Sequence, residues 1–342
     1  MAAERDFWRF FLLSALAVFT LAGFLYNKRT GSLKVSSIIS EHQEPSPQSP
    51  YVSLPPTTTR HPLIPPYPYP YTFLMNPLKK CQSGNPFLVL LVVSVSPDIR
   101  SRLAIRETWG NESNYGNVSV VTVFLVGLPT SVTDKVQQEL EEENRIYGDI
   151  VQQDFMDTYY NLTLKTLMGM EWVAKYCPTA SYVMKIDSDM FLNVEYLIHK
   201  VLLPDSPVRN NYLTGYIVPT SGPMRSKAYK WYVPKEVYPN DTYPPYCAGP
   251  GYVFSADLTQ KIYDVAQTIR VIPMEDSFIG ICMYELKIPL TTSPPNVFNG
   301  HWIDYERCLY NKLVTVHHYT HEKLREVWTD FWSKRKSECP KK

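Results

Sequence analysis

The chain has 342 residues, of which 44% are hydrophobic and 20% are charged, and its formal net charge is +1. This length suffices for one large domain or two small ones, and the near-neutral charge offers no basic surface of the kind that binds nucleic acid. We therefore expect no nucleic-acid partner.

The first element of the chain is an apolar run at residues 10–26, which contains seventeen residues and no charge. At about 1.5 Å per residue, a helix of this length reaches the short end of the range for a membrane span. A cleaved signal peptide is the alternative, but no small-residue cleavage pattern follows the run directly. We predict an uncleaved transmembrane signal anchor, with residues 1–9 as a cytosolic tail.

The segment after the anchor, residues 27–80, is rich in proline, with eleven prolines between residues 41 and 77. Because proline lacks a backbone amide donor, this density opposes both helices and sheet ladders. The composition predicts an extended stem that separates the membrane from a globular domain at residues 81–342.

Four N-glycosylation sequons follow the anchor, at Asn111, Asn117, Asn161 and Asn240. The six cysteines are an even number, and no two of them are spaced as in a zinc ribbon or a Cys-x-x-Cys redox motif. Together with the anchor, these features favour a lumenal position for the globular domain. The sequence leaves open which cysteines form disulfides.

The globular domain begins with an alternation of apolar strands and helices. Strands are predicted at 87–95, 118–126, 149–155 and from Tyr182 onward, and helices at 101–109, 132–146, 158–176, 193–203 and, near the end of the chain, 321–334. Such alternation predicts an α/β fold with a mostly parallel sheet and helices on both faces. Neither Gly-x-Gly-x-x-Gly after the first strand nor Gly-x-x-x-x-Gly-Lys occurs, which disfavours a dinucleotide or P-loop site.

The strand that begins at Tyr182 ends in two carboxylates, Asp187 and Asp189. Ligands of open parallel sheets bind beyond the carboxyl ends of the strands, so both acids are expected at the mouth of a site. Two neighbouring carboxylates repel each other unless a cation lies between them, and a divalent metal ion is the usual one. Taken alone, the motif is more typical of a turn after a strand.

Three regions of the C-terminal half carry further candidates. Residues 243–252 combine aromatic side chains with glycines, which indicates either a ligand-binding loop or an ordinary tight loop. Glu275 and Asp276 lie at an expected helix start, where a carboxylate either caps the helix or acts as a general base. His317 follows an apolar run, where a histidine is structural or binds a metal.

Together these motifs resemble those of the β-1,3-galactosyltransferase family, inverting glycosyltransferases related to Fringe with a GT-A fold. The resemblance rests on Arg-Leu-Ala-Ile-Arg-Glu-Thr-Trp-Gly at 102–110, Asn-Leu-Thr-Leu-Lys-Thr at 161–166, Lys-Ile-Asp-Ser-Asp at 185–189, Tyr-Cys-Ala-Gly-Pro-Gly-Tyr at 246–252 and Glu-Asp-Ser-Phe-Ile-Gly at 275–280. The segments follow the family's order, and the resemblance extends from about Cys81 to Cys339.

The resemblance implies roles for individual residues. It implies a Mn²⁺ ion held by Asp187, Asp189 and His317, a carboxylate and imidazole set that suits this metal. It implies UDP-galactose as the donor, in contact with Arg106, Lys165, Lys185 and Asp187. It implies Asp276 as the base that takes the proton of the acceptor hydroxyl. It implies acceptor contacts from Tyr246, Gly249, Gly251, Glu275 and Trp302.

The implied activity is transfer of galactose to the 3-hydroxyl of a terminal β-linked N-acetylglucosamine, on a glycoprotein or glycolipid glycan, by a type II protein of the Golgi membrane. Two alternatives remain, a β-1,3-N-acetylglucosaminyltransferase of the same fold and a non-catalytic lumenal carbohydrate-binding protein. The sequence departs from the family at Ser277, usually valine, and at Pro250, which lies between two glycines. Both departures leave acceptor preference open, and the oligomeric state is not predicted.

Overall fold

The computed structural model describes residues 67–82, 84–130, 134–204 and 206–340, which belong to one compact unit. The predicted tail and anchor, and the stem as far as residue 66, lie outside the described residues. None of the helices in the described part of the chain is both long enough and apolar enough to cross a membrane.

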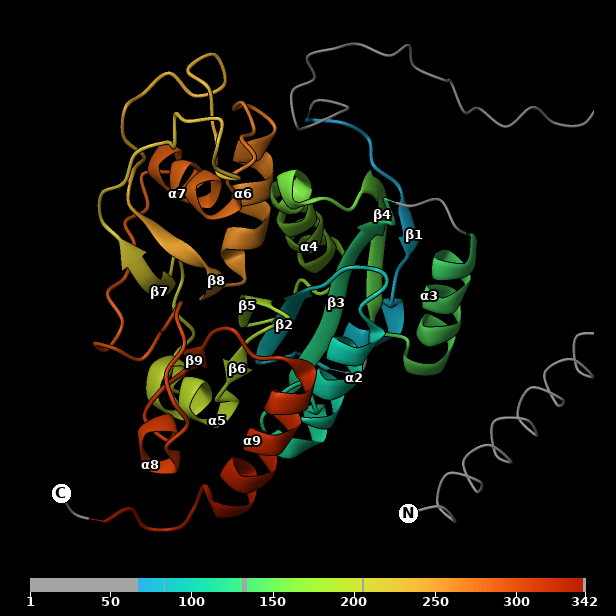
Figure 1. Ribbon diagram of the computed structural model, residues 1–342, viewed down its shortest axis with the longest axis vertical. Coiled ribbons are helices and arrows are strands. Elements are labelled where there is room, and N and C mark those ends of the chain that lie inside the picture. Colours follow the sequence, from blue (N-terminus) through green and yellow to red (C-terminus); the bar gives the residue numbers. More distant parts are fainter. Residues whose placement is uncertain (1–66, 83, 131–133, 205, 341–342) are drawn as a thin grey trace, which may run out of the picture. The chain divides into compact units, whose positions relative to one another are not determined.

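The described domain is built around a seven-stranded sheet with the strand order β1-β4-β3-β2-β5-β8-β7 (Figure 1). The strands are β1 Phe73–Met75, β2 Leu88–Val93, β3 Val120–Leu128, β4 Ile150–Met156, β5 Tyr182–Asp187, β7 Leu213–Val218 and β8 Tyr246–Ser255. Neighbouring strands within the block β4-β3-β2-β5 run parallel, which confirms the predicted parallel core. The outer strands β1, β8 and β7 pair antiparallel.

The parallel block is buried on both faces, since every residue of β2 is buried. Alternate side chains of a strand point to opposite faces, so one uninterrupted apolar run supplies two cores. Val89 and Leu91 pack in one core, and Leu88 and Leu90 pack in the other.

Helices cover both faces of this sheet (Figure 1). The first core includes residues of α4 Leu162–Tyr176, α6 Asp257–Ala266 and α7 Glu275–Glu285. The second core includes residues of α2 Ile99–Glu107, α8 Arg307–Tyr310, α9 His321–Lys334 and the continuous helix formed by α5 Val194–Tyr196 and η4 Leu197–Leu202. The remaining helices are α3 Asp134–Tyr147 and the short η1 Leu78–Cys81, η2 Glu112–Tyr115 and η3 Tyr159–Asn161.

A separate two-stranded ribbon joins distant parts of the chain. In it β6 Phe191–Leu192 pairs antiparallel with β9 Thr315–Val316, with Phe191 opposite Val316. Since Asp189 lies just before β6 and His317 just after β9, this pairing brings the two side chains together.

The expected boundary between stem and domain at residue 80 is corrected by the structure. Strand β1 lies within the predicted stem and pairs with β4. Tyr67, Tyr71 and Phe73 pack against the core, so the aromatic residues between the prolines hold this part of the stem on the domain.

Two disulfides are present, Cys81–Cys177 and Cys308–Cys339. The first fastens η1 to the residue that ends α4, and the second fastens α8 to the segment after α9. Cys247 and Cys282 are free and buried. Disulfides agree with the expected lumenal environment.

Candidate active site

A cavity of about 620 Å³ contains most of the candidate residues. Its lining comes from the carboxyl end of β5, the turn before β6, the residues after β9, the middle of β8 and the first turn of α7. The acidic, basic and histidine side chains that line it are Lys185, Asp187, Asp189, Lys230, Glu275, Asp276, His317 and His318. The cavity therefore lies where open α/β sheets bind ligands, beyond the carboxyl end of a central strand.

One side of the cavity carries a group of side chains suited to a metal ion. Asp189, His317 and His318 each offer a ligand atom, and these atoms all lie within 4.8 Å of one another. The two imidazole rings stack with their centroids 3.9 Å apart. His318 adopts a positive φ of 70°, an uncommon conformation for a residue other than glycine. One carboxylate and two imidazoles form a donor set that suits a divalent transition metal.

The orientation of His317 is fixed by both ring nitrogens. Nδ1 lies 3.1 Å from the carbonyl oxygen of Gly300, and Nε2 lies 3.2 Å from Oδ2 of Asp189. A backbone carbonyl beside Nδ1 favours the tautomer that leaves Nε2 free to bind a metal. Burial opposes the charge on Asp189, but the hydrogen bond and charge of His317 outweigh it and lower the pKa of Asp189. Burial likewise opposes protonation of His317, and Asp189 outweighs it and raises the pKa of His317.

Asp187 is engaged differently from Asp189. Its Oδ1 accepts a hydrogen bond of 2.6 Å from Nζ of Lys185, and it is not part of the metal-binding group. Of the metal ligands expected from the sequence, the structure brings together Asp189 and His317. It adds His318, which could have been suggested only by its position directly after His317.

The carboxylate of Asp276, in the first turn of α7, also lines the cavity. Oδ2 of Asp276 accepts a hydrogen bond of 3.1 Å from the amide of Gly249, and Oδ1 accepts one of 2.8 Å from the amide of Ser277. Burial raises the pKa of Asp276, although these amides and Lys185 oppose the rise. A carboxylate with a raised pKa is a better proton acceptor than an ordinary one, which suits a general base.

Lys185 links strand β5 to β8 and to the first residue of α7. Its side chain is 4% exposed, and Nζ donates to Asp187 and, over 2.5 Å, to the carbonyl oxygen of Gly249. Nζ also lies 3.5 Å from Oε2 of Glu275, whose Oε1 accepts a hydrogen bond of 2.6 Å from the hydroxyl of Tyr252. Burial opposes the charge on Lys185, but Asp187 and Glu275 outweigh it and raise the pKa of Lys185.

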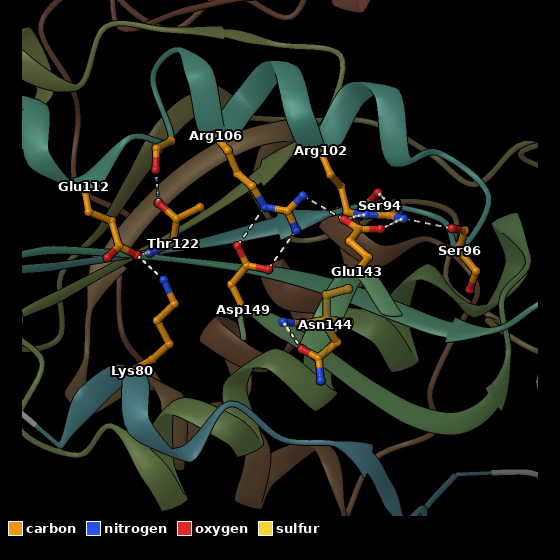
Figure 2. A network of polar contacts seen from close by, with 12 residues as sticks. Lys80, Ser94, Ser96, Arg102, Arg106, Glu112, Thr122, Glu143, Asn144 and Asp149 are labelled. Carbon is orange, nitrogen blue, oxygen red and sulfur yellow. Dashed lines mark hydrogen bonds and ion pairs between the residues drawn. The ribbon is translucent and has the colours of Figure 1, made fainter. Parts of the chain in front are cut away.

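The predicted position of Arg106 beside the donor diphosphate is corrected by the structure. Its guanidinium forms ion pairs of 2.8 Å with both Glu143 and Asp149 (Figure 2). The guanidinium also lies over the rings of Phe124 and Tyr147. Arg106 does not line the cavity, because acids from α3 and from the residue before β4 hold its guanidinium between these elements.

Lys165 also lies outside the cavity lining. Its side chain is 1% exposed, and Nζ donates to Oδ1 of Asp157 over 2.6 Å and to the carbonyl oxygen of Ser94 over 2.5 Å. Burial is the main cause of its lowered pKa. Lys165 therefore supports the segments beside the site.

The residues expected to bind the acceptor are divided. Gly249 and Glu275 line the cavity, whereas Tyr246, Gly251 and Trp302 do not. The hydroxyl of Tyr246 accepts a hydrogen bond from Ser221. A Cβ on Gly251 would lie 3.3 Å from the side chain of Met184, so this glycine serves close packing.

Trp302 lies apart from the cavity. Its Nε1 donates to Asp304, and its ring centroid is 5.1 Å from that of Tyr319. The lining instead includes Tyr159, Lys230 and Trp231, which the sequence analysis missed. Tyr159 lies at the start of a predicted helix, and Lys230 and Trp231 lie in the connection between β7 and β8, so only their aromatic and basic character could have suggested them.

The sequons also differ in accessibility. Asn117 and Asn240 are exposed, and Asn111 is half-buried. Asn161 is 3% exposed, and its Nδ2 donates to the carbonyl oxygen of Met156 over 2.8 Å. The expectation of a glycan on Asn161 is therefore corrected, because the atom that would carry the sugar holds the turn after β4 in place.

Sequence comparisons identify the family of this chain. Residues 100–294 match the family model described as Galactosyltransferase. Beta-1,3-galactosyltransferase 2 of Mus musculus is 46% identical over 274 residues, which cover 79% of this chain and 64% of that protein. Beta-1,3-galactosyltransferase 1 of Mus musculus is 42% identical over 274 residues, which cover 80% of this chain and 82% of that protein. The chain thus spans just under two thirds of the first relative's length.

Comparison with solved structures gives weaker similarities. A glycosyltransferase involved in the glycosylation of the major capsid of PBCV-1 has a TM-score of 0.38 and 11% identity, with 72% of this chain and 100% of that chain covered. Galactosyltransferase LgtC in complex with donor and acceptor sugar analogs has a TM-score of 0.36 and 10% identity, with 74% and 98% covered. Scores this low support no inference about the site.

Proposed function

This chain belongs to the galactosyltransferase family, and we propose that it transfers galactose from UDP-galactose to the 3-hydroxyl of a terminal β-linked N-acetylglucosamine. The observation that carries the proposal is the cavity in which the group Asp189, His317 and His318 lies together with Asp276. A nucleotide-sugar transferase needs two functions in one space, a cation at the departing diphosphate and a base at the attacking hydroxyl.

The metal-binding group defines the donor end of the cavity. Its carboxylate and imidazole ligands fit Mn²⁺, and the bound ion would neutralise the charge that develops on the departing UDP. Asp189 and His317 hold each other in position, and Gly300 fixes the imidazole tautomer. Asp187, paired with Lys185, would face the sugar or ribose of the donor.

Asp276 defines the acceptor end. The acceptor 3-hydroxyl would give its proton to the carboxylate of Asp276 while its oxygen forms the new bond to the anomeric carbon. The bond from that carbon to UDP breaks, and its electron pair leaves with the nucleotide. Attack from the face opposite UDP converts an α-linked donor to a β-linked product.

The proposed setting is the Golgi membrane, with the anchor at residues 10–26 and the catalytic domain in the lumen. Exposed sequons at Asn117 and Asn240 and the two disulfides support an oxidising, glycosylating compartment. Removal of N-glycans with a glycosidase should increase the electrophoretic mobility of the cellular protein, and an unchanged mobility would argue against this setting.

The activity is tested with the full chain in detergent, since a fragment that begins after β1 would lose a strand of the sheet. A β-linked N-acetylglucosamine acceptor is incubated with Mn²⁺ and, separately, UDP-galactose or UDP-N-acetylglucosamine. Chelator-sensitive transfer of galactose to the 3-hydroxyl is expected. Transfer only from UDP-N-acetylglucosamine would show that this sugar nucleotide, and not UDP-galactose, is the donor. Binding of UDP without transfer from either donor would favour the non-catalytic alternative.

A further inference from the structure

An aromatic group on the cavity wall has no role in the chemistry described above. It consists of Tyr159, which begins η3 after β4, and Trp231, which lies in the connection between β7 and β8. Their residues are 41% and 43% exposed, so each leaves a large apolar surface open to solvent. Nζ of Lys230 lies 5.0 Å from the ring centroid of Tyr159 and 5.2 Å from that of Trp231, which joins the three side chains by cation–π contacts.

This aromatic group lines the same cavity as Asp276. Pro273 and Met274, which directly precede the first turn of α7, line the cavity with it. The hydroxyl of Thr163, four residues after Tyr159, donates to the carbonyl oxygen of Ile272 over 2.8 Å. The segment that carries Tyr159 therefore lies beside the residues that lead into α7 and Asp276.

The segment that carries Trp231 is braced. Val233, two residues further on, is fully buried, and its amide donates to the carbonyl oxygen of Met224 over 2.9 Å. The guanidinium of Arg225 donates to the carbonyl oxygens of Val233, Tyr238 and Asn240 over 2.7, 2.9 and 2.7 Å. This bracing holds the indole at the cavity before any ligand arrives, which lowers the entropy cost of binding.

The chemistry of this wall suits a pyranose. A pyranose ring presents an apolar face of C–H groups and a polar rim of hydroxyls, and an aromatic ring can cover the apolar face while carboxylates contact the rim. We propose, on the premise of the proposed function, that Trp231 together with Tyr159 forms the platform on which the acceptor sugar stacks, so that Trp231 determines acceptor binding.

The test compares two tryptophans of similar exposure. Trp231→Ala is measured beside Trp302→Ala, since Trp302 is 38% exposed, does not line the cavity, and was the tryptophan expected from the sequence. In Trp231→Ala the KM for an N-acetylglucosamine glycoside should rise roughly tenfold, as expected for one lost stacking contact. The KM for UDP-galactose and the slow hydrolysis of UDP-galactose without acceptor should stay within twofold of wild type. Trp231→Phe should restore most of the acceptor affinity, and Trp302→Ala should leave all of these values unchanged.

The outcomes separate this inference from the proposed function. If the wild-type chain transfers galactose and Trp231→Ala keeps the wild-type acceptor KM, or Trp302→Ala raises it instead, the platform is overturned. If the wild-type chain transfers nothing, the proposed function fails. In that case, saturation-transfer NMR measures binding of the N-acetylglucosamine glycoside to the wild type and to Trp231→Ala, and the comparison decides the inference. Binding that depends on Trp231 supports it, whereas equal or absent binding overturns it. Thermal melting of each variant shows whether it is folded.

Discussion

Replacement of Asp276 by asparagine is the most direct test of the catalytic assignment. The change keeps the size of the side chain and removes its ability to accept a proton. Loss of a positioned general base typically lowers the rate roughly 10²–10⁴-fold, which corresponds to about 3–5 kcal/mol of transition-state stabilisation. Transfer in Asp276→Asn should fall by this factor.

The structure predicts only a small change in stability for the same variant. Asp276 accepts amide hydrogen bonds from Gly249 and Ser277 with separate oxygens, and asparagine has one carbonyl oxygen, so one bond of about 1 kcal/mol is lost. The raised pKa of Asp276 means that folding disfavours its charge, and the neutral amide relieves that cost. The two effects oppose each other, so the free energy of unfolding should change by about 1 kcal/mol or less.

The assay measures kcat for galactose transfer by the full chain and the affinity for UDP with Mn²⁺ by calorimetry, which should be unchanged. A matched control is Asp257→Asn, because Asp257 also lies in the first turn of a helix and accepts a backbone hydrogen bond, from Asn211, but lies outside the cavity. The control should keep its turnover. A fall in turnover of less than roughly tenfold in Asp276→Asn would refute the assignment, because a loss this small is below the range expected for a general base.

Four further predictions concern the metal site, the pH dependence, Arg106 and a disulfide. His318→Ala should raise the Mn²⁺ concentration for half-maximal activity by at least the roughly 10–100-fold typical of a weakened metal site, and an unchanged metal titration would exclude His318 as a ligand. The acidic limb of the kcat/KM profile should lie above the usual pKa range of aspartate, because the base works when ionised and activity is lost as the pH falls through the raised pKa of Asp276. Mn²⁺ binding is checked over the same pH range. An acidic limb at the ordinary pKa of aspartate would contradict this prediction. Arg106→Ala should lose about 3 kcal/mol of stability in chemical denaturation while its KM for UDP-galactose stays unchanged, whereas a raised KM would return Arg106 to the donor site. The double variant Cys81→Ser, Cys177→Ser removes a disulfide between residues 96 positions apart and should lower the free energy of unfolding by about 2–5 kcal/mol. An equal melting temperature in the wild type and the double variant would show that the disulfide adds no stability.

The parallel half of the fold could be predicted from sequence because its strands are buried on both faces. Continuous apolar runs mark β2, β3 and β5, and the helices between them differ from the predicted ranges by a few residues at the ends. Strand β8 was expected as a glycine-rich loop, because its middle contains Gly249, Pro250 and Gly251. Pairing with β5 and β7 imposes the extended conformation there, and such a long-range contact leaves little local signal.

The same contrast applies to the candidate site. Asp189 and His317 could be placed by their positions at strand ends, and Asp276 by its position at a helix start. Arg106 and Lys165 were misplaced because a positive charge in a motif does not indicate which acid will hold it. Glu143 and Asp149 engage the first, and Asp157 engages the second.

The position of the cavity follows from one feature of the sheet. Strand β5 is parallel to β2 on one side and antiparallel to β8 on the other, so the sheet changes direction at the strand that carries Asp187. On the parallel side, the carboxyl end of β5 carries Asp187 to the cavity, which is where open α/β sheets bind ligands. On the antiparallel side, β8 brings Gly249 to the same cavity, and its amide donates to Oδ2 of Asp276 on α7. Lys185 crosses this border with hydrogen bonds to both sides, to Asp187 of β5 and to Gly249 of β8. Asp187, carried by β5, and Asp276, held by the amide of Gly249 on β8, therefore line one cavity although they depend on the two different halves of the sheet.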